Sequence, residues 1–329
     1  MNGEIRFTGK ERAVLAPIGK PASPDPGCIM GKTLYSLISP GTELNAGFLQ
    51  EHVKPATTGY ASVFEVEEIG EGVDSAAIGD RFLCMHPHKS YQQVPVKEAI
   101  PVPAKLDPAE AAIARLLNIG MTTLMTTKAR PGDNVLITGA GPIGFLSALL
   151  FARSGYEVML CDPDEARLRK AQQAGIQRAV KEIPIQDSVW QGKVSLVLEC
   201  SGHESAAIDS CHMLRKGGEL VLAGVPWNRY TDRYAQELLS LVFHRYVTLR
   251  SGWEWELPIV SQDFMPHSVQ ENLRTGLRWL AEGLFDASPH IRKVSPMHAQ
   301  EAYTELAGRQ VEELFVLFDW TRMEGEHAE

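Results

Sequence analysis

The sequence has few cysteines, no block of basic residues and no apolar core in its opening residues. Its five cysteines form no Cys-X-X-Cys pair, which argues against a disulfide framework and favours reduced thiols in a cytoplasmic protein. The net charge is −9, and this charge without a basic block argues against nucleic acid and anionic membrane surfaces as partners. The opening residues, MNGEIRFTGKER, have no apolar core and do not predict a secretory signal.

The chain also lacks internal repeats and low-complexity segments. Its 329 residues, of which 44% are hydrophobic and 22% charged, suffice for two soluble domains with ordinary cores. The longest apolar stretch, residues 135–162, contains glycines and a proline. We therefore do not expect it to span a membrane.

That stretch has the order strand, glycine turn, helix, strand and acid. A β-branched run at 135–138 leads into Gly-Ala-Gly-Pro-Ile-Gly at 139–144, and a second apolar run ends at Asp162. This is the order that a dinucleotide-binding βαβ unit needs. The alternative is a glycine-rich turn in another kind of α/β protein.

Each residue of the turn has a predicted role in binding the cofactor. Gly139 allows a tight turn, Gly141 leaves room for a pyrophosphate, and Gly144 lets the helix lie close to the strand. Pro142 and Ile143 begin the helix, whose positive end faces the phosphates.

Asp162 predicts which dinucleotide binds. Its carboxylate can accept hydrogen bonds from the adenine-ribose hydroxyls and would repel a 2′-phosphate, which favours NAD over NADP. Arg167 can reach the ribose or a phosphate, or it can be a solvated helix residue. Ser201 and Gly224, at the ends of later predicted strands, complete the candidate cofactor-binding residues.

The pattern around this unit predicts the domain organisation. Residues 1–118 consist of short strands separated by turns, which is typical of a partly closed barrel. Residues 119–257 alternate strand and helix, which predicts a doubly wound parallel sheet. Residues 258–329 hold two helices and a last strand at 312–319, and we expect them to return to the first domain.

This domain order resembles the medium-chain dehydrogenase/reductase superfamily over nearly the whole chain. The resemblance implies an α/β protein with a GroES-like β-rich catalytic domain and a Rossmann domain. Besides the glycine turn, the landmarks are Gly70-Glu71-Gly72-Val73, Ile78-Gly79-Asp80-Arg81, Pro131-Gly132-Asp133, Glu199-Cys200-Ser201-Gly202 and Lys216-Gly217-Gly218.

The positions that hold zinc in metal-dependent members of that superfamily differ here. By resemblance, Ser39 stands at the first cysteine, Tyr60 stands at the histidine of Gly-His-Glu, and the third ligand falls near Arg115. Serine and tyrosine are poor zinc ligands at neutral pH, and arginine is a cation. The four-cysteine lobe is also missing. We therefore predict neither a catalytic nor a structural zinc.

The stretch Ser39-Pro40-Gly41-Thr42-Glu43 resembles the zinc-free branch of the superfamily. That branch contains sugar- and cyclitol-type oxidoreductases. The bacteriochlorophyllide dehydrogenase group has a similar turn and an ending similar to Leu317-Phe318-Asp319-Trp320, but its glycine turn is usually less complete. The resemblance leaves the substrate open.

Without zinc, hydride transfer between an alcohol and nicotinamide needs a protein group that polarises or protonates the substrate oxygen. We predict Tyr60 in this role, against the alternative of a tyrosine packed in a barrel strand. Thr42 and Ser39 form a hydroxyl relay, or they bond only to the local turn. Glu43 orients the relay or is a structural carboxylate. Arg115 binds a substrate oxygen or forms an interdomain ion pair.

Three further features lie outside this set of catalytic candidates. His88 and Lys89 belong to a loop for which a surface role is favoured. A metal site from Cys84, His86 and His88 is an alternative, although a His-Pro-His turn is more often a surface loop. Asn118 lies near the nicotinamide side of the cofactor in the resemblance.

These observations predict a zinc-independent NAD(H)-dependent oxidoreductase that interconverts a secondary alcohol and a ketone on a polar, sugar- or cyclitol-like small molecule. A homodimer is expected from the resemblance. The alternatives are a quinone or enoyl reductase using NADPH, a bacteriochlorophyllide-type alcohol dehydrogenase, and a nucleotide-binding protein without turnover.

Overall fold

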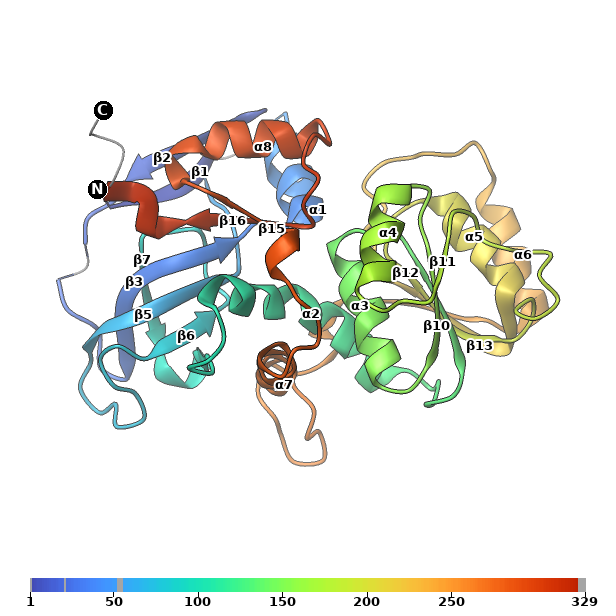
Figure 1. Cartoon of the computed structure of the whole chain (residues 1–329), viewed down its shortest axis with the longest axis horizontal. Coiled ribbons are helices and arrows are strands. Elements are labelled where there is room, and N and C mark those ends of the chain that lie inside the picture. Colours follow the sequence, from blue (N-terminus) through green and yellow to red (C-terminus); the bar gives the residue numbers. More distant parts are fainter. Residues whose placement is uncertain (1, 21, 52–55, 325–329) are drawn as a thin grey trace. The chain divides into compact units, whose positions relative to one another are not determined.

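The computed structural model describes residues 2–20, 22–51 and 56–324. The chain divides into two compact units (Figure 1): unit 1 is formed by Met1–Arg115 and Leu273–Glu329, and unit 2 by Leu116–Asn272. Helices α2 (Pro108–Thr126) and α7 (Val269–Ala281) include the two points of the sequence at which one unit gives way to the other.

Unit 1 is β-rich, as its short strands and frequent turns predict. A seven-stranded sheet has the order β15-β16-β3-β5-β6-β8, with β7 also paired to β3, and a three-stranded sheet has the order β2-β1-β4. The strands are β1 (Gly3–Gly9), β2 (Arg12–Pro17), β3 (Cys28–Leu37), β4 (Ala56–Thr57), β5 (Ser62–Ile69), β6 (Arg81–Cys84), β7 (Tyr91–Pro95), β8 (Ile100–Pro101), β15 (Ile291–Val294) and β16 (Phe315–Asp319).

The C-terminal segment completes this unit. Strand β16 pairs with β3 in antiparallel register, Leu317 opposite Leu37, and helix α8 (Ala299–Ala307) packs on β2. In Figure 1 these red elements lie beside the blue N-terminal strands. Phe7, Phe48 and Tyr303 form one aromatic cluster in this core, with Phe7 meeting Tyr303 edge-on at 4.9 Å between ring centres.

Short helical turns connect the strands of unit 1. Helix α1 (Pro40–Glu43) begins with a proline directly after Ser39. Proline suits the first position of a helix because an N–H there would have no acceptor within the helix. It continues as a π-helical turn. The π-helical turn and the 3-10 turns of unit 1 are Leu44–Phe48, Val96–Glu98, Ser288–His290, Pro296–His298 and Trp320–Glu324.

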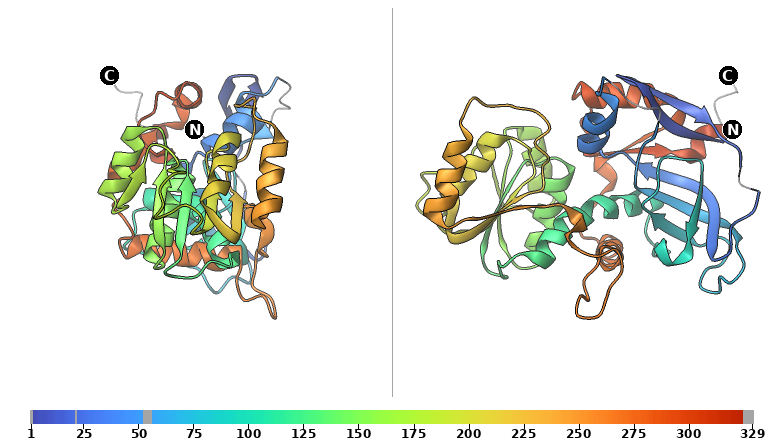
Figure 2. Two further views of the ribbon diagram at one scale, coloured as in Figure 1. Left: turned by 90° about the vertical axis from the view of Figure 1, so that its right-hand side faces the viewer. Right: turned by 180° about the vertical axis from the view of Figure 1, so that it is seen from behind.

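Unit 2 is the doubly wound parallel sheet that the alternating pattern predicts. Its six strands have the order β11-β10-β9-β12-β13-β14, all parallel, with helices on both faces (Figure 2). The elements are β9 (Asn134–Thr138), α3 (Pro142–Arg153), β10 (Glu157–Cys161), α4 (Glu165–Gln173), β11 (Arg178–Val180), β12 (Val194–Glu199), α5 (Glu204–Met213), β13 (Leu214–Leu222), α6 (Ala235–Arg245), β14 (Thr248–Ser251) and a 3-10 turn (Glu254–Glu256).

The centre of this sheet is apolar because its strands are covered on both faces. Every residue of β12 is buried. Strand β13 begins at Leu214, earlier than the glycines at 217 and 218 suggest. Gly217 has a φ of +76°, and the register of the pairing with β12 shifts between Leu214 and Glu219. In the described part of the chain, no helix combines the length and the apolar character that a membrane crossing requires.

Candidate active site

The glycine turn of unit 2 connects β9 to α3 with the geometry that its spacing predicts. Gly139 has a φ of +85°, which L side chains rarely adopt. A Cβ at Gly144 would lie 1.7 Å from the carbonyl oxygen of Gly139, so only glycine fits there. A Cβ at Gly141 would have no atom within 4 Å. The turn is thus closed on the strand side and open beside the start of α3, where Pro142 and Ile143 lie.

Asp162 lies beside this turn and is fixed by it. The carboxylate is 4% exposed and accepts hydrogen bonds from the backbone of Ala140 at 2.6 Å and of Asp164 at 2.8 Å. Arg167 approaches it, with a guanidinium nitrogen 3.8 Å from a carboxylate oxygen, and is itself half exposed. Each carboxylate oxygen has two lone pairs, so Asp162 can accept further hydrogen bonds from ribose hydroxyls.

Ser201 and Gly224 also lie at this end of the sheet. A Cβ at Gly139 would meet the backbone nitrogen of Ser201 at 2.8 Å, and a Cβ at Gly224 would meet that of Gly202 at 2.4 Å. The structure therefore brings all the predicted cofactor-binding residues of unit 2 to the glycine turn and the strand ends around it.

Glu199, which was not among the residues predicted to bind the cofactor, also lies in this region. Its buried carboxylate accepts hydrogen bonds from the backbone of Ser201 at 2.7 Å and of Gly202 at 3.0 Å. Burial raises the pKa of Glu199, and the hydrogen bonds from Ser201 and Gly202 only partly oppose it. The carboxylate thus holds the turn after β12 against the glycine turn. The Glu-Cys-Ser-Gly landmark, which begins with Glu199, is the sequence feature from which a role for this residue could have been predicted.

A buried side-chain hydrogen bond joins two residues of unit 2 that are far apart in the sequence. The Asn118 side-chain amide donates to the Glu254 carboxylate at 2.6 Å, and both residues are buried. The tryptophans on either side of Glu254 are more open, with 69% of Trp253 and 45% of Trp255 exposed. The pair links α2 to the turn after β14.

Unit 1 gathers the five predicted catalytic residues into one cluster. The Tyr60 hydroxyl donates to the Ser39 hydroxyl and also shares a hydrogen bond with Thr42. The guanidinium carbon of Arg115 lies 4.6 Å from the centre of the Tyr60 ring, and Arg115 is only 2% exposed. Burial raises the pKa of Tyr60, while Ser39, Arg115 and Thr42 oppose that rise. The phenol is therefore protonated at neutral pH.

Glu43 accepts four hydrogen bonds beneath this cluster. One carboxylate oxygen takes the backbone N–H of Ser39 at 2.7 Å. The other oxygen lies 2.5 Å from the Tyr303 hydroxyl, 3.0 Å from the Thr58 hydroxyl and 3.1 Å from Nε2 of His88. Burial raises the pKa of Glu43, but His88 and the hydrogen bonds from Ser39 and Tyr303 outweigh it, so the pKa lies below its ordinary value.

His88 corrects an expectation from the sequence. A surface role was favoured for its loop, but His88 is fully buried. With a proton on Nε2 it donates to Glu43, and its Nδ1 lies 2.7 Å from the Ser36 hydroxyl, which also accepts from the Trp320 indole at 2.8 Å. These partners come from distant parts of the chain, and single-residue patterns cannot reveal them. Lys89, by contrast, is about one-third exposed and pairs with Glu4 at 3.4 Å.

The hydroxyl cluster does not fit a zinc ion. Ser39 and Tyr60 already bond to each other, and the guanidinium of Arg115 places a positive charge beside them. A divalent cation in the same place would have neutral oxygen ligands and a cationic neighbour. The described residues also include no group of three His, Cys, Asp or Glu side chains arranged to hold a metal.

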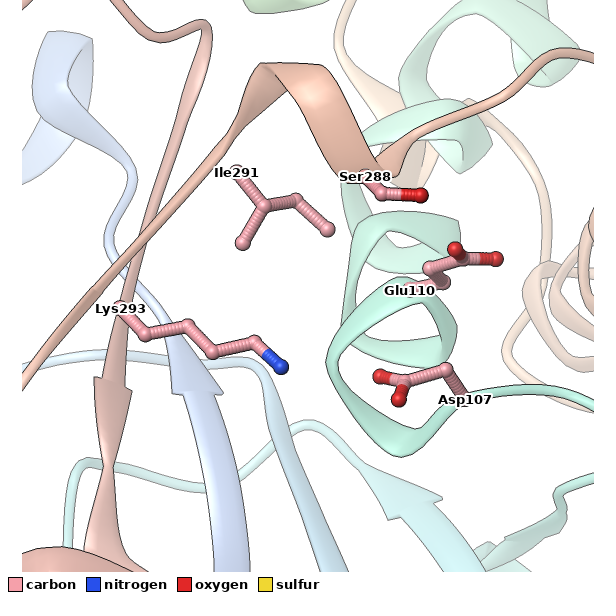
Figure 3. A pocket seen from close by; sticks show the side chains of 5 residues that line it. All are labelled: Asp107, Glu110, Ser288, Ile291 and Lys293. Atoms are coloured by element: carbon pink, nitrogen blue, oxygen red, sulfur yellow. The ribbon is translucent and has the colours of Figure 1, made fainter.

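Unit 1 also has a polar hollow of about 170 Å³ away from these residues. Asp107, Glu110, Ser288, Ile291 and Lys293 line it, and the Lys293 amine points toward the side of the two carboxylates (Figure 3). Asp107 caps α2 through the backbone of Ala109 at 2.7 Å. None of the predicted site residues lines this hollow, so we do not assign it a part in the chemistry.

The described architecture consists of a β-rich unit and a doubly wound unit that carries a glycine turn between β9 and α3. The family model described as zinc-binding dehydrogenase matches residues 142–251. Sorbitol dehydrogenase of Halalkalibacterium halodurans is 29% identical over 210 residues, which cover 52% of this chain and 61% of that protein. The match thus spans less than two thirds of this relative.

Solved structures share the fold over nearly the whole chain. Galactitol-1-phosphate dehydrogenase from Escherichia coli superposes with a TM-score of 0.80 at 18% identity, covering 97% of this chain and 100% of that one. A zinc-binding dehydrogenase from Sinorhizobium meliloti 1021 bound to NADP superposes with a TM-score of 0.77 at 20% identity, covering 97% and 99%. These findings confirm the predicted GroES-like and Rossmann fold, and they support the predicted resemblance to the medium-chain dehydrogenase/reductase superfamily.

Proposed function

We propose that the protein is a zinc-independent, NAD(H)-dependent oxidoreductase that interconverts a secondary alcohol and a ketone on a polar, sugar- or cyclitol-like substrate. One observation carries this proposal: Tyr60, Ser39 and Arg115, which stand at or near the zinc-ligand positions of the family, form a cluster with a hydroxyl donor and a fixed cation. Ser39 and Arg115 are buried, and Tyr60 is half-buried. The polyol dehydrogenases among the relatives support a hydroxylated substrate.

Unit 2 supplies the binding residues for the dinucleotide in this proposal. The open side of the turn at Gly141 and the start of α3 receive the pyrophosphate. Asp162 and Arg167 face the adenine ribose, and Ser201 and Gly224 shape the adjoining strand ends. The bound nicotinamide would supply or accept the hydride. The residues of unit 2 orient the dinucleotide and disfavour NADP.

The preference for NAD rests on Asp162. The NADP-bound structure shares this fold, so the fold alone does not select between the two cofactors. Here the carboxylate is held in place by two backbone hydrogen bonds. A 2′-phosphate at this carboxylate would meet an anion that cannot swing away.

Unit 1 supplies the proton in this proposal. Because the raised pKa keeps Tyr60 protonated at neutral pH, the phenol can donate to the oxygen of a ketone that accepts a hydride. In the reverse direction the same group must first lose its proton, so alcohol oxidation should speed up as the pH rises. Ser39 and Thr42 hold the hydroxyl and connect it to the turn. The assignment of catalysis to residues 1–118, cofactor binding to 119–257 and a return at 258–329 is part of the proposal.

A homodimer is a further part of the proposal. Among the described strands, β14 pairs only with β13 and leaves its other edge open. Leu239 and Phe243, one turn apart on α6, and Leu249 of β14 are exposed apolar side chains of unit 2. An open edge with apolar neighbours is a typical place for a second copy to add its strand.

The alternative functions make different demands on the same residues. A quinone or enoyl reductase using NADPH needs no zinc, but Asp162 disfavours its cofactor. A bacteriochlorophyllide-type dehydrogenase would accept a large macrocycle rather than a polyol. A nucleotide-binding protein without turnover would not need the hydroxyl cluster.

The test is a turnover assay with NAD⁺ or NADP⁺ against polyols and with NADH or NADPH against keto-sugars. We expect saturable turnover with NAD(H) and a loss of about 100-fold or more in kcat for Tyr60→Phe, with unchanged NADH binding. Thr126→Val is the control, because its hydroxyl bonds only within α2 among the described contacts. Full activity of Tyr60→Phe would remove Tyr60 from the mechanism, and NADPH preference would favour the reductase alternative.

A further inference from the structure

The Tyr60–Ser39 hydroxyl pair is close to two buried side chains of opposite formal charge. The guanidinium carbon of Arg115 lies 4.6 Å from the Tyr60 ring centre. The Glu43 carboxylate accepts the backbone N–H of Ser39 at 2.7 Å, and the side chain of Ser39 accepts a hydrogen bond from Tyr60. All three elements belong to unit 1.

Arg115 is held where its charge has a strong effect. It is the largest of the fully buried side chains and is 2% exposed. Water screens a charge poorly at such a position, and a cation facing an aromatic ring is attracted to it. A positive charge beside the phenol stabilises the phenolate form, which is the form that exists after the proton is donated.

Glu43 is also held in a fixed position. Its carboxylate is 4% exposed, and Tyr303 from α8, Thr58 from the segment after β4 and His88 from the loop before β7 all bond to it. A negative charge near the phenol disfavours the phenolate. The groups that face Tyr60 are thus Ser39, Thr42 and Glu43 around α1 and Arg115 on α2.

We infer that Glu43 and Arg115 are positioning residues that tune the Tyr60 hydroxyl in opposite directions, Arg115 through the ring and Glu43 through Ser39. This inference builds on the proposed role of Tyr60 as proton donor. Arg115 takes over the electrostatic role that a metal ion has in zinc-dependent relatives, and Glu43 opposes ionisation of the phenol in the same direction as burial does.

The test uses the full chain without cofactor or substrate. 3,5-Difluorotyrosine is placed at position 60, where its ring fluorines lower the intrinsic pKa of the phenol into the pH range that folded proteins tolerate. The ionisation is followed by ¹⁹F NMR in this background and in the same background with Glu43→Gln or Arg115→Gln. We expect the midpoint to move to lower pH with Glu43→Gln and to higher pH with Arg115→Gln.

Two further variants separate tuning from simple loss of structure. Arg115→Lys keeps the positive charge, so its midpoint should lie nearer the wild-type value than that of Arg115→Gln. Thr58→Val removes a hydrogen bond to Glu43 without removing a charge. When it is combined with Glu43→Gln or with Arg115→Gln, the midpoint should still move in the direction expected for that variant. If Arg115→Gln does not fold, Glu43→Gln and Arg115→Lys still test the inference.

Unmoved midpoints in Glu43→Gln and the Arg115 variants, or shifts in the same direction, would overturn the inference. Because the titration needs no turnover, opposite shifts in a protein with no oxidoreductase activity would preserve the tuning of Tyr60 and reject only the proposed function. Turnover without opposite shifts would preserve the proposed function and reject the tuning of Tyr60 by Glu43 and Arg115.

Discussion

In unit 2 the candidate binding turn is a property of the backbone, whereas in unit 1 the candidate chemistry depends on side chains from separate segments. Gly139, Gly141 and Gly144 act through the absence of a side chain, within one strand–turn–helix connection. Glu43 meets His88 and Tyr303, which come from a distant loop and from the C-terminal return. The first kind of site is encoded locally, and the second exists only after the fold has formed.

The largest expected effect tests the side-chain site. Glu43→Leu leaves the buried donors of Tyr303, Thr58 and Ser39 without their acceptor, so we expect a loss of about 3–5 kcal/mol in the free energy of unfolding. Urea denaturation measures it. The control is Glu51→Leu, because Glu51 is 70% exposed in its side chain and should change stability by less than about 0.5 kcal/mol. Equal stability of both variants would contradict the structural role of Glu43.

The next effect tests the backbone site. Gly144→Ala places a Cβ against the carbonyl of Gly139, so the turn must shift, and we expect a loss of about 1–3 kcal/mol together with loss of NADH binding. Gly141→Ala meets no atom within 4 Å and should keep its stability while binding NADH more weakly. If Gly144→Ala bound NADH like the wild type, the turn would not be the phosphate site.

These two predictions also show how much the sequence could reveal. The parallel sheet, the glycine turn and Asp162 followed from spacing, because their geometry is fixed within a short stretch. The cluster of Ser39, Tyr60 and Arg115 followed only from the resemblance to a family. The bonds of Glu43 to Tyr303 and His88 could not be predicted, since nothing in a single sequence pairs residues that meet only through packing.

A smaller effect concerns the selection of the cofactor in unit 2. Asp162→Ala combined with Pro163→Arg removes the anion and adds a cation, so we expect NADH affinity to fall about tenfold and NADPH affinity to rise. Nicotinamide fluorescence titration gives both constants. Asp162→Asn retains an acceptor for the backbone of Ala140 and serves as the control for damage to the turn. An unchanged ratio of the two affinities would reject our assignment of Asp162.

The smallest effect compares the two buried glutamates. The pKa of Glu43 is lowered in the folded state, so its contribution to stability is present above the unfolded pKa and is lost as the pH falls. The pKa of Glu199 is raised by burial, so its contribution is present below the unfolded pKa and is lost as the pH rises. Denaturation at neutral and acidic pH should therefore show Glu43→Gln and Glu199→Gln altering the pH dependence in opposite directions. Parallel changes would contradict this assignment.

The central claim is that unit 1 performs its chemistry with the Tyr60 hydroxyl and the Arg115 cation rather than with a metal. The most direct test is metal analysis of the purified protein by mass spectrometry, combined with the turnover assay before and after dialysis against a chelator. We predict far less than one zinc per chain and turnover that survives the chelator. One zinc per chain whose removal abolishes turnover and whose return restores it would contradict the claim.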